Sequence, residues 1–368
     1  MSHRQAHVSL RSRLRTALKW LHLWLGLSAG LLFAVVALSG TVLAFQRELL
    51  VLAYPQLGEH ALPSAEQRGR ALERIVGHWQ TQGMSSIDLP TPALPVWQAY
   101  FPDNERRYFD PASGELLLLR NTDNDLLLWL RDLHIHLLAG KTGEQVLGVV
   151  GLAAVFLLAS GLYLWWPRWK ALAASLKWYR GPPTRRWLSW HRGIGLWLLP
   201  LTLLAALTGV SMVYDDVVRD GLRAAFGDAK PRKPPKLEAR DAPIDWAATL
   251  HAAEAAVAAD GPLAGARLSR ISLPKAGSGL IAIRSRAVDE WHPVGRSMVW
   301  LDPYQGRLIG TLDATRQGLG TRSYESIYPL HGGFVGGRTW QWLIALTGLA
   351  PPFLLVTGFL FWRRRRNR

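Results

Sequence analysis

Four histidines stand in two repeated patterns, and imidazole is the side chain that proteins use most often to bind a metal centre. His134 and His331 are separated by 197 positions, and His22 and His191 by 169 positions. The same two shifts superimpose unlike neighbours. These are Gly140 on Gly337, Gly151 on Gly348, Gly161 on Gly358, Trp165 on Trp362, Gly26 on Gly195 and Gly40 on Gly209. The chain therefore contains an internal repeat of two similar halves.

The two members of each histidine pair are expected to lie at one depth of a helical bundle, because an internal two-fold axis would relate the halves. Two neutral imidazoles that face each other across a bundle suit axial ligation of haem iron. Copper or zinc could use the same imidazoles, but no carboxylate or thiolate joins either pair, which favours haem. We expect two haem b groups, one on His22 and His191 and one on His134 and His331.

His136 is the alternative to His134 as the ligand of the second group. It aligns with Gly333 under the repeat, which favours His134. If residues 134–161 formed one unbroken helix, however, His136 would share a face with Gly140 and the glycines that follow.

Other polar residues have weaker interpretations. Lys141 and Arg338 are repeat-related cations two helical turns beyond their histidines. They are interpreted first as anchors at the membrane surface and second as partners of haem propionates. The histidines interpreted as ordinary surface residues are His60, His78, His251 and His292.

Four apolar runs are expected to position these histidines in a bilayer. The runs cover roughly residues 21–45, 146–166, 193–214 and 339–362, and each is long enough to cross the hydrocarbon layer as a helix. The first run is too long for the core of a signal peptide, so we expect it to remain as an anchor. A histidine at this depth is costly, so a functional role is the default expectation.

The distribution of charge predicts the orientation. The net charge is +16, and segments 1–20, 167–192 and 363–368 hold five, seven and five Lys or Arg and no Asp or Glu. Cations beside membrane ends mark the cytoplasmic side, so both termini and the middle loop are expected in the cytoplasm. Because the positive charge is concentrated beside the membrane ends, nucleic acid is not an expected partner. The absence of cysteine excludes disulfides, iron–sulfur clusters and covalently attached haem.

The two long outer loops repeat one order of elements. A helix is expected at 63–81, where apolar residues recur at helical spacing. A second helix is expected at 244–259. Strands are expected at 96–101 and 106–110 in the first loop and at 267–273, 278–286 and 296–301 in the second. An Asp-Pro-x-x-Gly turn follows at 110–114 and at 302–306. Each loop is therefore expected to form a small α+β module. Residues 229–243, which are basic and rich in Pro, are expected to form a linker in the second loop.

These features together resemble the PepSY-associated transmembrane family over nearly the whole chain. The matching pieces are Leu21-His22, Leu133-His134, Trp190-His191, Leu330-His331-Gly332-Gly333 and the paired turns. Within that family the chain is most similar to the inner-membrane, haem-containing ferric-siderophore reductases. This resemblance implies a ferric siderophore as substrate and an electron donor in the cytoplasm or the membrane.

The expected fold is a membrane α-helical bundle of four transmembrane helices with a two-fold internal repeat and two periplasmic α+β PepSY-like modules. The transmembrane helices are expected within 1–45, 133–166, 190–214 and 330–362. The modules are expected at 46–132 and 215–329. The remaining segments, 167–189 and 363–368, are expected in the cytoplasm.

The expected function is an inner-membrane di-haem b oxidoreductase that reduces a ferric siderophore in the periplasm and releases Fe²⁺. Aromatic side chains can cover the apolar face of a chelate while one edge stays wet. The residues proposed for that role are Trp129, Tyr324 and Tyr328. Two alternatives stay open: a non-redox siderophore or iron permease component, and a PepSY sensory or protease-regulating protein. Haem content separates them.

Overall fold

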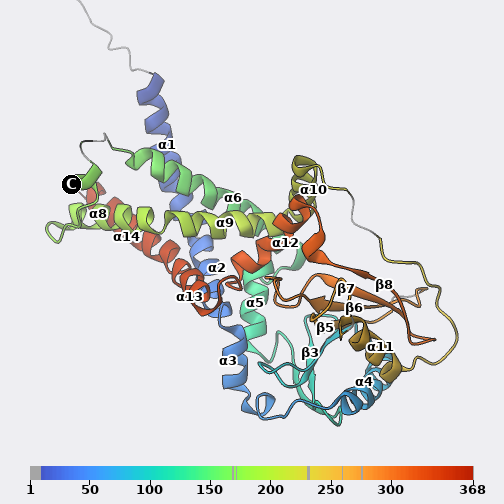
Figure 1. The fold of residues 1–368 in the computed structure, drawn as a ribbon. Helices are drawn as coiled ribbons and strands as arrows, with labels where there is room; N and C mark the ends of the chain where they lie inside the picture. The colour runs from blue at the N-terminus through green and yellow to red at the C-terminus, as the bar shows by residue number, and fades with distance from the viewer. Residues whose placement is uncertain are drawn as a thin grey trace, which may run out of the picture. The chain divides into compact units, whose positions relative to one another are not determined.

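The computed structural model describes residues 10–167, 170, 172–229, 233–258, 260–274 and 277–367 (Figure 1). The chain divides into two compact units, each built from separate stretches of sequence. The first unit comprises Met1–Ala44, Arg131–Tyr214 and Leu330–Arg368. The second comprises Phe45–Leu130 and Asp215–Pro329. Parts of the expected N-terminal segment, of the 167–189 loop and of the 229–243 linker lie outside the described residues.

The first unit is built from helices in its described part. Two helices, α5 (Leu126–His136) and α12 (Leu319–His331), enter it with their last residues. The helices that lie wholly within it are α1 (Leu10–Leu27), α2 (Ala29–Leu43), α6 (Gly140–Trp165), α7 (Leu172–Ser175), α8 (Pro183–Trp197), α9 (Leu199–Val213), α13 (Gly337–Thr347) and α14 (Ala350–Arg366).

In the described part of the chain, two helices are candidates for membrane spans, or four if each of two bent helix pairs is one span. Gly140–Trp165 and Gly337–Arg366 are each long and apolar enough to cross a bilayer. The helix pairs α1–α2 and α8–α9 also pass this test if each pair is one span, although they bend by 48° and 64° at their breaks. The four expected apolar runs therefore correspond to these two helices and two bent pairs.

The side chains of the first unit are arranged as in a membrane protein. Leu31, Val149 and Val356 are all more than half exposed, although they are large and apolar. Small hydroxyl residues are instead buried, among them Ser39, Ser160, Thr208 and Thr357. Small and polar residues at helix–helix contacts, with apolar residues outside, fit a lipid solvent.

The second and fourth expected transmembrane helices are interrupted next to their histidines. Leu137 and Leu138 have φ values of 48° and 59°, which end α5 before α6 begins at Gly140. On the other side of the repeat, α12 ends at His331, and α13 begins at Gly337. The condition of one unbroken helix over 134–161, under which His136 would share a face with Gly140, is therefore not met. His134 and His331 lie at the ends of short helices that precede the long apolar ones.

The second unit contains one antiparallel sheet of eight strands, in the order β4-β3-β2-β1-β5-β6-β7-β8. The first loop supplies β1 (Ser86–Asp88), β2 (Trp97–Tyr100), β3 (Arg106–Phe109) and β4 (Leu116–Arg120). The second loop supplies β5 (Arg267–Ser272), β6 (Ile281–Arg286), β7 (Ser297–Asp302) and β8 (Arg307–Leu312). Its remaining helices are α3 (Gln46–Ala53), α4 (Ala65–Trp79), α10 (Asp215–Phe226) and α11 (Trp246–Ala258), with short 3₁₀ turns at Pro55–Leu57, Gln80–Gln82 and Ala314–Arg316.

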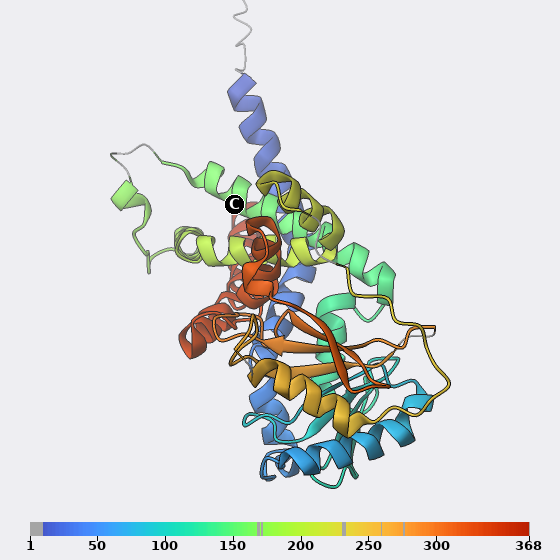
Figure 2. The same ribbon diagram turned by 45° about the vertical axis from the view of Figure 1, so that its right-hand side comes forward.

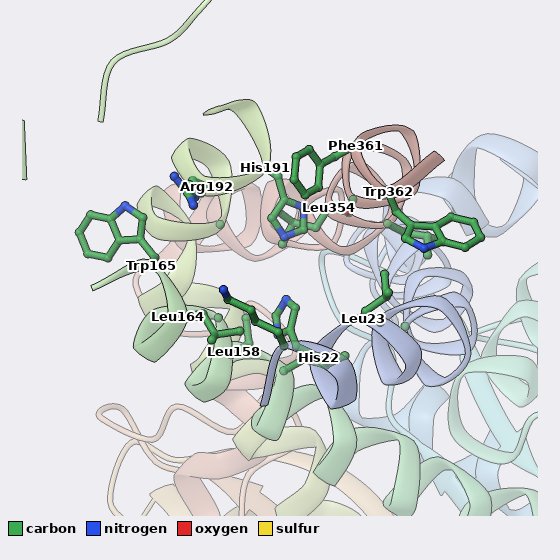
Figure 3. A pocket seen from close by; sticks show the side chains of 18 of the residues that line it. His22, Leu23, Leu158, Leu164, Trp165, His191, Arg192, Leu354, Phe361 and Trp362 are labelled. Carbon is green, nitrogen blue, oxygen red and sulfur yellow. Dashed lines mark hydrogen bonds between the residues drawn. The ribbon is translucent and has the colours of Figure 1, made fainter. Parts of the chain in front are cut away.

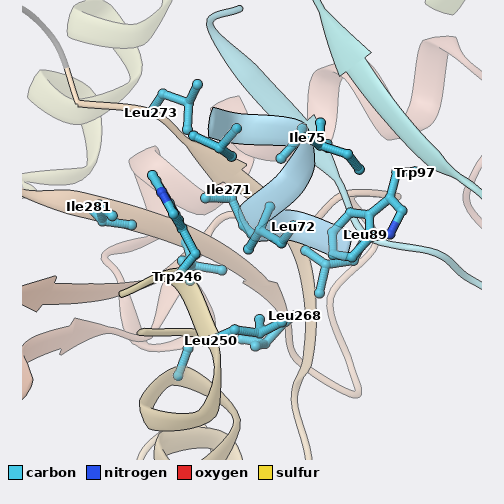
Figure 4. Packing of buried hydrophobic residues seen from close by; sticks show 14 of the residues in the cluster. Leu72, Ile75, Leu89, Trp97, Trp246, Leu250, Leu268, Ile271, Leu273 and Ile281 are labelled. Atoms are coloured by element: carbon cyan, nitrogen blue, oxygen red, sulfur yellow. The ribbon is translucent and has the colours of Figure 1, made fainter. Parts of the chain in front are cut away.

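The two outer modules share this sheet instead of standing apart. Strand β1 pairs with β5, and Ile87 lies opposite Ile271 at the junction. Helices α4 and α11 lie side by side on one face of the sheet (Figure 2). Leu72 and Ile75 of the first loop pack into the same core as Leu250 of the second (Figure 4). The helix and strands of each module therefore bury their apolar side chains together with those of the other module, in one shared core.

The paired Asp-Pro-x-x-Gly turns are present as predicted. The Asp110 carboxylate accepts hydrogen bonds from the backbone N–H groups of Ala112 and Ser113, at 2.9 and 2.6 Å. The Asp302 carboxylate accepts one from the Tyr304 N–H at 3.0 Å. Gly114 and Gly306 close these turns with φ values of 73° and 57°, which glycine adopts without steric cost.

Candidate functional site

The four repeat-related histidines lie in two ring-to-ring pairs. The ring centroids of His22 (α1) and His191 (α8) are 6.3 Å apart, with an interplanar angle of 82°. Those of His134 (α5) and His331 (α12) are 6.0 Å apart, with an angle of 47°. Each pair joins one histidine from the first half of the chain to its equivalent in the second, as the sequence repeat predicts.

Every one of the four imidazoles is held through its Nδ1 atom. His134 Nδ1 lies 2.9 Å from the Val36 carbonyl oxygen, and His191 Nδ1 lies 3.0 Å from that of Leu354. Because a carbonyl can only accept, Nδ1 carries the proton in both rings.

The other two rings reach the same tautomer through hydroxyl groups. His22 Nδ1 lies 2.9 Å from Ser160 Oγ, and His331 Nδ1 lies 3.0 Å from Thr208 Oγ1. Each hydroxyl donates its own proton to a backbone carbonyl one turn earlier, so it accepts from the imidazole. All four Nε2 atoms are therefore left with a lone pair, which is the form of imidazole that binds a metal.

The residues that orient the histidines are themselves repeat-related, although the sequence analysis did not identify them. Ser39 and Thr208 are 169 positions apart, and Ser160 and Thr357 are 197 positions apart. Ser39 and Thr357 also contact their histidines, at 3.1 and 3.3 Å from His134 and His191 Nδ1. The shifts that relate the histidines therefore also relate one hydroxyl partner for each ring.

A glycine follows each of these hydroxyl residues and makes room for the imidazole. A Cβ atom at Gly40 would lie only 2.8 Å from His134 Cε1, closer than such atoms approach one another. At the other three positions the distance to the corresponding Cε1 would be 3.2 to 3.4 Å. These positions are Gly161, Gly209 and Gly358. Each Ser/Thr-Gly dipeptide thus accommodates one histidine ring, and we call it a histidine seat. The four seats are residues 39–40, 160–161, 208–209 and 357–358.

A cavity of about 690 Å³ adjoins the His22–His191 pair. Most of its lining is apolar, and Figure 3 shows His22 and His191 on opposite sides of it, with Leu158 and Leu354 nearby. Four cations also line it: Arg15, Lys19, Arg192 and Arg365. An apolar slot between two imidazoles, with cations at its border, matches a flat macrocycle that carries two carboxylates.

The geometry of both pairs fits haem. Two imidazoles that shared one metal ion through bonds of about 2.0–2.1 Å would have ring centroids up to roughly 6 Å apart. The observed separations are 6.3 and 6.0 Å. The described residues contain no group of three or more His, Cys, Asp or Glu that could hold a metal ion.

The remaining predicted residues occupy other surroundings. His136 Nδ1 lies 2.8 Å from an Asp132 carboxylate oxygen on its own helix, and His136 does not form the ring pair with His331. Lys141 forms an ion pair with Glu144 at 2.8 Å. Arg338 donates to the Gln341 side chain at 3.1 Å. His136 was the alternative ligand only if residues 134–161 formed one unbroken helix, and the break at Leu137 and Leu138 interrupts that helix.

The predicted substrate-binding aromatics lie on α5 and α12. Trp129, on α5, is 39% exposed. Tyr324 and Tyr328 are one helical turn apart on α12. The ring of Tyr328 lies 5.3 Å from that of His292, and the Arg219 guanidinium lies 5.9 Å from the Tyr324 ring. His292 is only 7% exposed, so its interpretation as an ordinary surface residue was wrong. The segment around His292 is polar, so its sequence did not predict that the ring would be buried against Tyr328 of α12.

The chain matches a known family over almost its whole length. The profile of the PepSY-associated TM region matches residues 19–365, which is almost the whole chain. The protein belongs to the PepSY-associated transmembrane family. No curated protein matches the chain.

Membership of the PepSY-associated family makes this a membrane protein, in agreement with its apolar helices. The matched region includes all four paired histidines and the four Ser/Thr-Gly seats. The histidine pairs are therefore part of the PepSY-associated region itself and are not an appendage to it.

Proposed function

We propose that the protein is a membrane di-haem b oxidoreductase that reduces a ferric siderophore outside the cytoplasm and releases Fe²⁺. The observation that carries the proposal is the arrangement of two imidazole pairs at 6.3 and 6.0 Å with all four Nε2 atoms available. When bound, haem would supply one-electron transfer.

The residues of the chain have separate tasks in this proposal. His22 and His191 hold one haem, and His134 and His331 hold the other. The hydroxyl and carbonyl groups at each Nδ1 fix the tautomer and the ring plane, and they raise the basicity of the ligand. Arg15 and Arg192 border the first cavity, where they can pair with propionates.

The substrate chemistry follows from the preference of iron for its ligands. A siderophore holds Fe³⁺ through hard oxygen atoms, and Fe²⁺ is a weaker partner for such ligands. One electron, supplied by a cytoplasmic or membrane donor, converts Fe³⁺ to Fe²⁺ and lets the metal leave the chelate. We place both termini in the cytoplasm and the second unit in the periplasm of a bacterial inner membrane, because the basic segments flank the membrane ends on one side.

A permease component is the second candidate, because two spans are broken. The pairs α1–α2 and α8–α9 bend by 48° and 64° near Ser28 and Leu198. Discontinuous helices often house substrate or ion sites in transporters. This reading predicts transport without bound haem, so haem content decides between the two.

The reductase proposal predicts rapid reoxidation of the reduced protein. We expect that anaerobic, dithionite-reduced protein, freed of excess reductant, is reoxidised by a ferric hydroxamate siderophore, with the product Fe²⁺ trapped by ferrozine. Replacing Tyr324 and Tyr328 together with alanine should slow reoxidation about tenfold at unchanged haem content, because two aromatic docking surfaces are lost.

The control is the double change of the same tyrosines to phenylalanine, which keeps both rings. It should react at nearly the wild-type rate. Haem-loaded, reduced protein that reacts with no ferric chelate would refute the reductase assignment.

A further inference from the structure

The sheet of the second unit has one face without the packed helices α4 and α11, and that face is strongly basic. On β6, Ile281 and Ile283 point into the core, whereas Arg284 and Arg286 alternate with them and point to the other face. The arginines that gather there include Arg106, Arg270, Arg284, Arg286 and Arg296. The neighbouring carboxylates are Asp88, Glu290 and Glu325. Positive charge is therefore in excess.

Two of these arginines lie directly opposite each other on neighbouring strands. Arg270 of β5 is paired in register with Arg284 of β6. Like charges at such a cross-strand position destabilise a sheet. Arg270 is compensated, since it donates to an Asp88 carboxylate oxygen at 2.8 Å and to the Tyr100 hydroxyl at 2.6 Å.

Arg284 has no such direct partner, although the charges of Glu325 and Asp88 act on it without contact. Within the part of the chain that the structure describes, its guanidinium forms neither an ion pair nor a side-chain hydrogen bond, and its side chain is half-buried. Burial, followed by the nearby guanidinium groups of Arg296 and Arg270, lowers the pKa of Arg284. Arg296 is itself engaged by Glu325 at 2.6 Å. A half-buried arginine beside other arginines, with no carboxylate in direct contact, is an arrangement that an anion would stabilise.

His292 adds a neutral hydrogen-bond donor to the same group. Its Nδ1 accepts from the Val294 backbone N–H at 3.2 Å, so the ring proton resides on Nε2. Burial, followed by Arg296, Arg284, Arg270 and Arg286, lowers the pKa of His292 to about 3. The ring therefore stays neutral at ordinary pH and can donate from Nε2 without adding charge.

We propose that this basic face, centred on Arg284 with His292 and Arg270 beside it, is a binding site for an anionic ferric chelate whose ligand groups are carboxylates or catecholates. Guanidinium groups bind such oxygen pairs in a bidentate manner. The identification of the anion as a ferric chelate rests on the proposed reductase function. Tyr328 packs on His292, with ring centroids 5.3 Å apart, and precedes His331 by three positions in the sequence.

The test uses the full chain in lipid nanodiscs and gallium(III) citrate, an anionic chelate that cannot be reduced. Binding is measured by equilibrium dialysis against a neutral gallium(III) trihydroxamate as the reference probe. We expect the wild type to prefer the citrate complex, with an affinity that falls as salt is raised. Arg284→Gln should weaken citrate binding about tenfold, the amount that one charge-assisted hydrogen bond typically contributes.

Two further variants keep the result interpretable. Arg74→Gln removes the same charge from α4, on the opposite face of the sheet, and should bind citrate as the wild type does. Arg284→Lys keeps the charge but not the planar fork, and it should bind more tightly than Arg284→Gln.

Equal binding by the wild type and both Arg284 variants would overturn the proposal, as would equal affinity for the neutral chelate. Because gallium(III) stays oxidised, binding that follows these expectations together with failed reoxidation by ferric chelates would reject the reductase function alone.

Discussion

Replacing His22 with alanine should lower the haem content of the purified protein from two per chain to one. His22 and His191 form one pair with ring centroids 6.3 Å apart, and the second pair lies on different helices. Loss of one axial ligand opens one site only. The haem content is measured as the pyridine haemochrome per chain, and the reduced spectrum should keep the signature of the remaining bis-histidine group.

His251→Ala is the matched control, because His251 is an exposed residue on α11 of the second unit. It should retain two haems per chain. An unchanged haem content in His22→Ala, with the protein folded, would show that the first pair is not a ligand set.

His134→Ala should likewise remove one haem, whereas His136→Ala should leave the content close to two. The two residues are neighbours on α5, but only His134 forms the ring pair with His331. Val36 and Ser39 hold the His134 ring through Nδ1, and His136 is engaged by Asp132. Haemochrome assays on the two variants, prepared side by side, give the comparison.

These two variants form their own control, because they alter the same residue type two positions apart. The opposite outcome, in which His136→Ala loses a haem and His134→Ala keeps both, would show that the partner of His331 is a different histidine from the one that the repeat indicates.

The repeat made the histidine pairing predictable from the sequence. Shifts of 169 and 197 positions relate His22 to His191 and His134 to His331, and two-fold symmetry then brings equivalents together. The hydroxyl partners were available from the same shifts. Without a packing register, however, nothing indicated which serine or threonine on a facing helix would meet an Nδ1 atom.

The helix break beside His134 could not be predicted in the same way. Leu137 and Leu138 adopt positive φ values, a region that leucine rarely occupies. A run of leucines ordinarily predicts a continuing helix. Because the break depends on the surrounding structure, the sequence left open whether residues 134–161 form one unbroken helix.

The union of the two outer modules was also beyond sequence reasoning. It depends on β1, which is only three residues long and pairs with β5 across more than 170 positions. The modules themselves were predictable because α4, α11 and the paired turns have strong local signals, including the Ser64–Gln67 capping box of α4. Long-range pairing of so short a strand leaves no local pattern to detect.

The haem content of the purified wild-type chain tests the central claim most directly. The protein is expressed with sufficient haem supply, purified in detergent and assayed as the pyridine haemochrome, with protein determined by amino-acid analysis. Two imidazole pairs with free Nε2 atoms predict two haems of the b type per chain, reducible by dithionite. Folded protein that carries no haem, and takes up none when haem is added, would contradict the account.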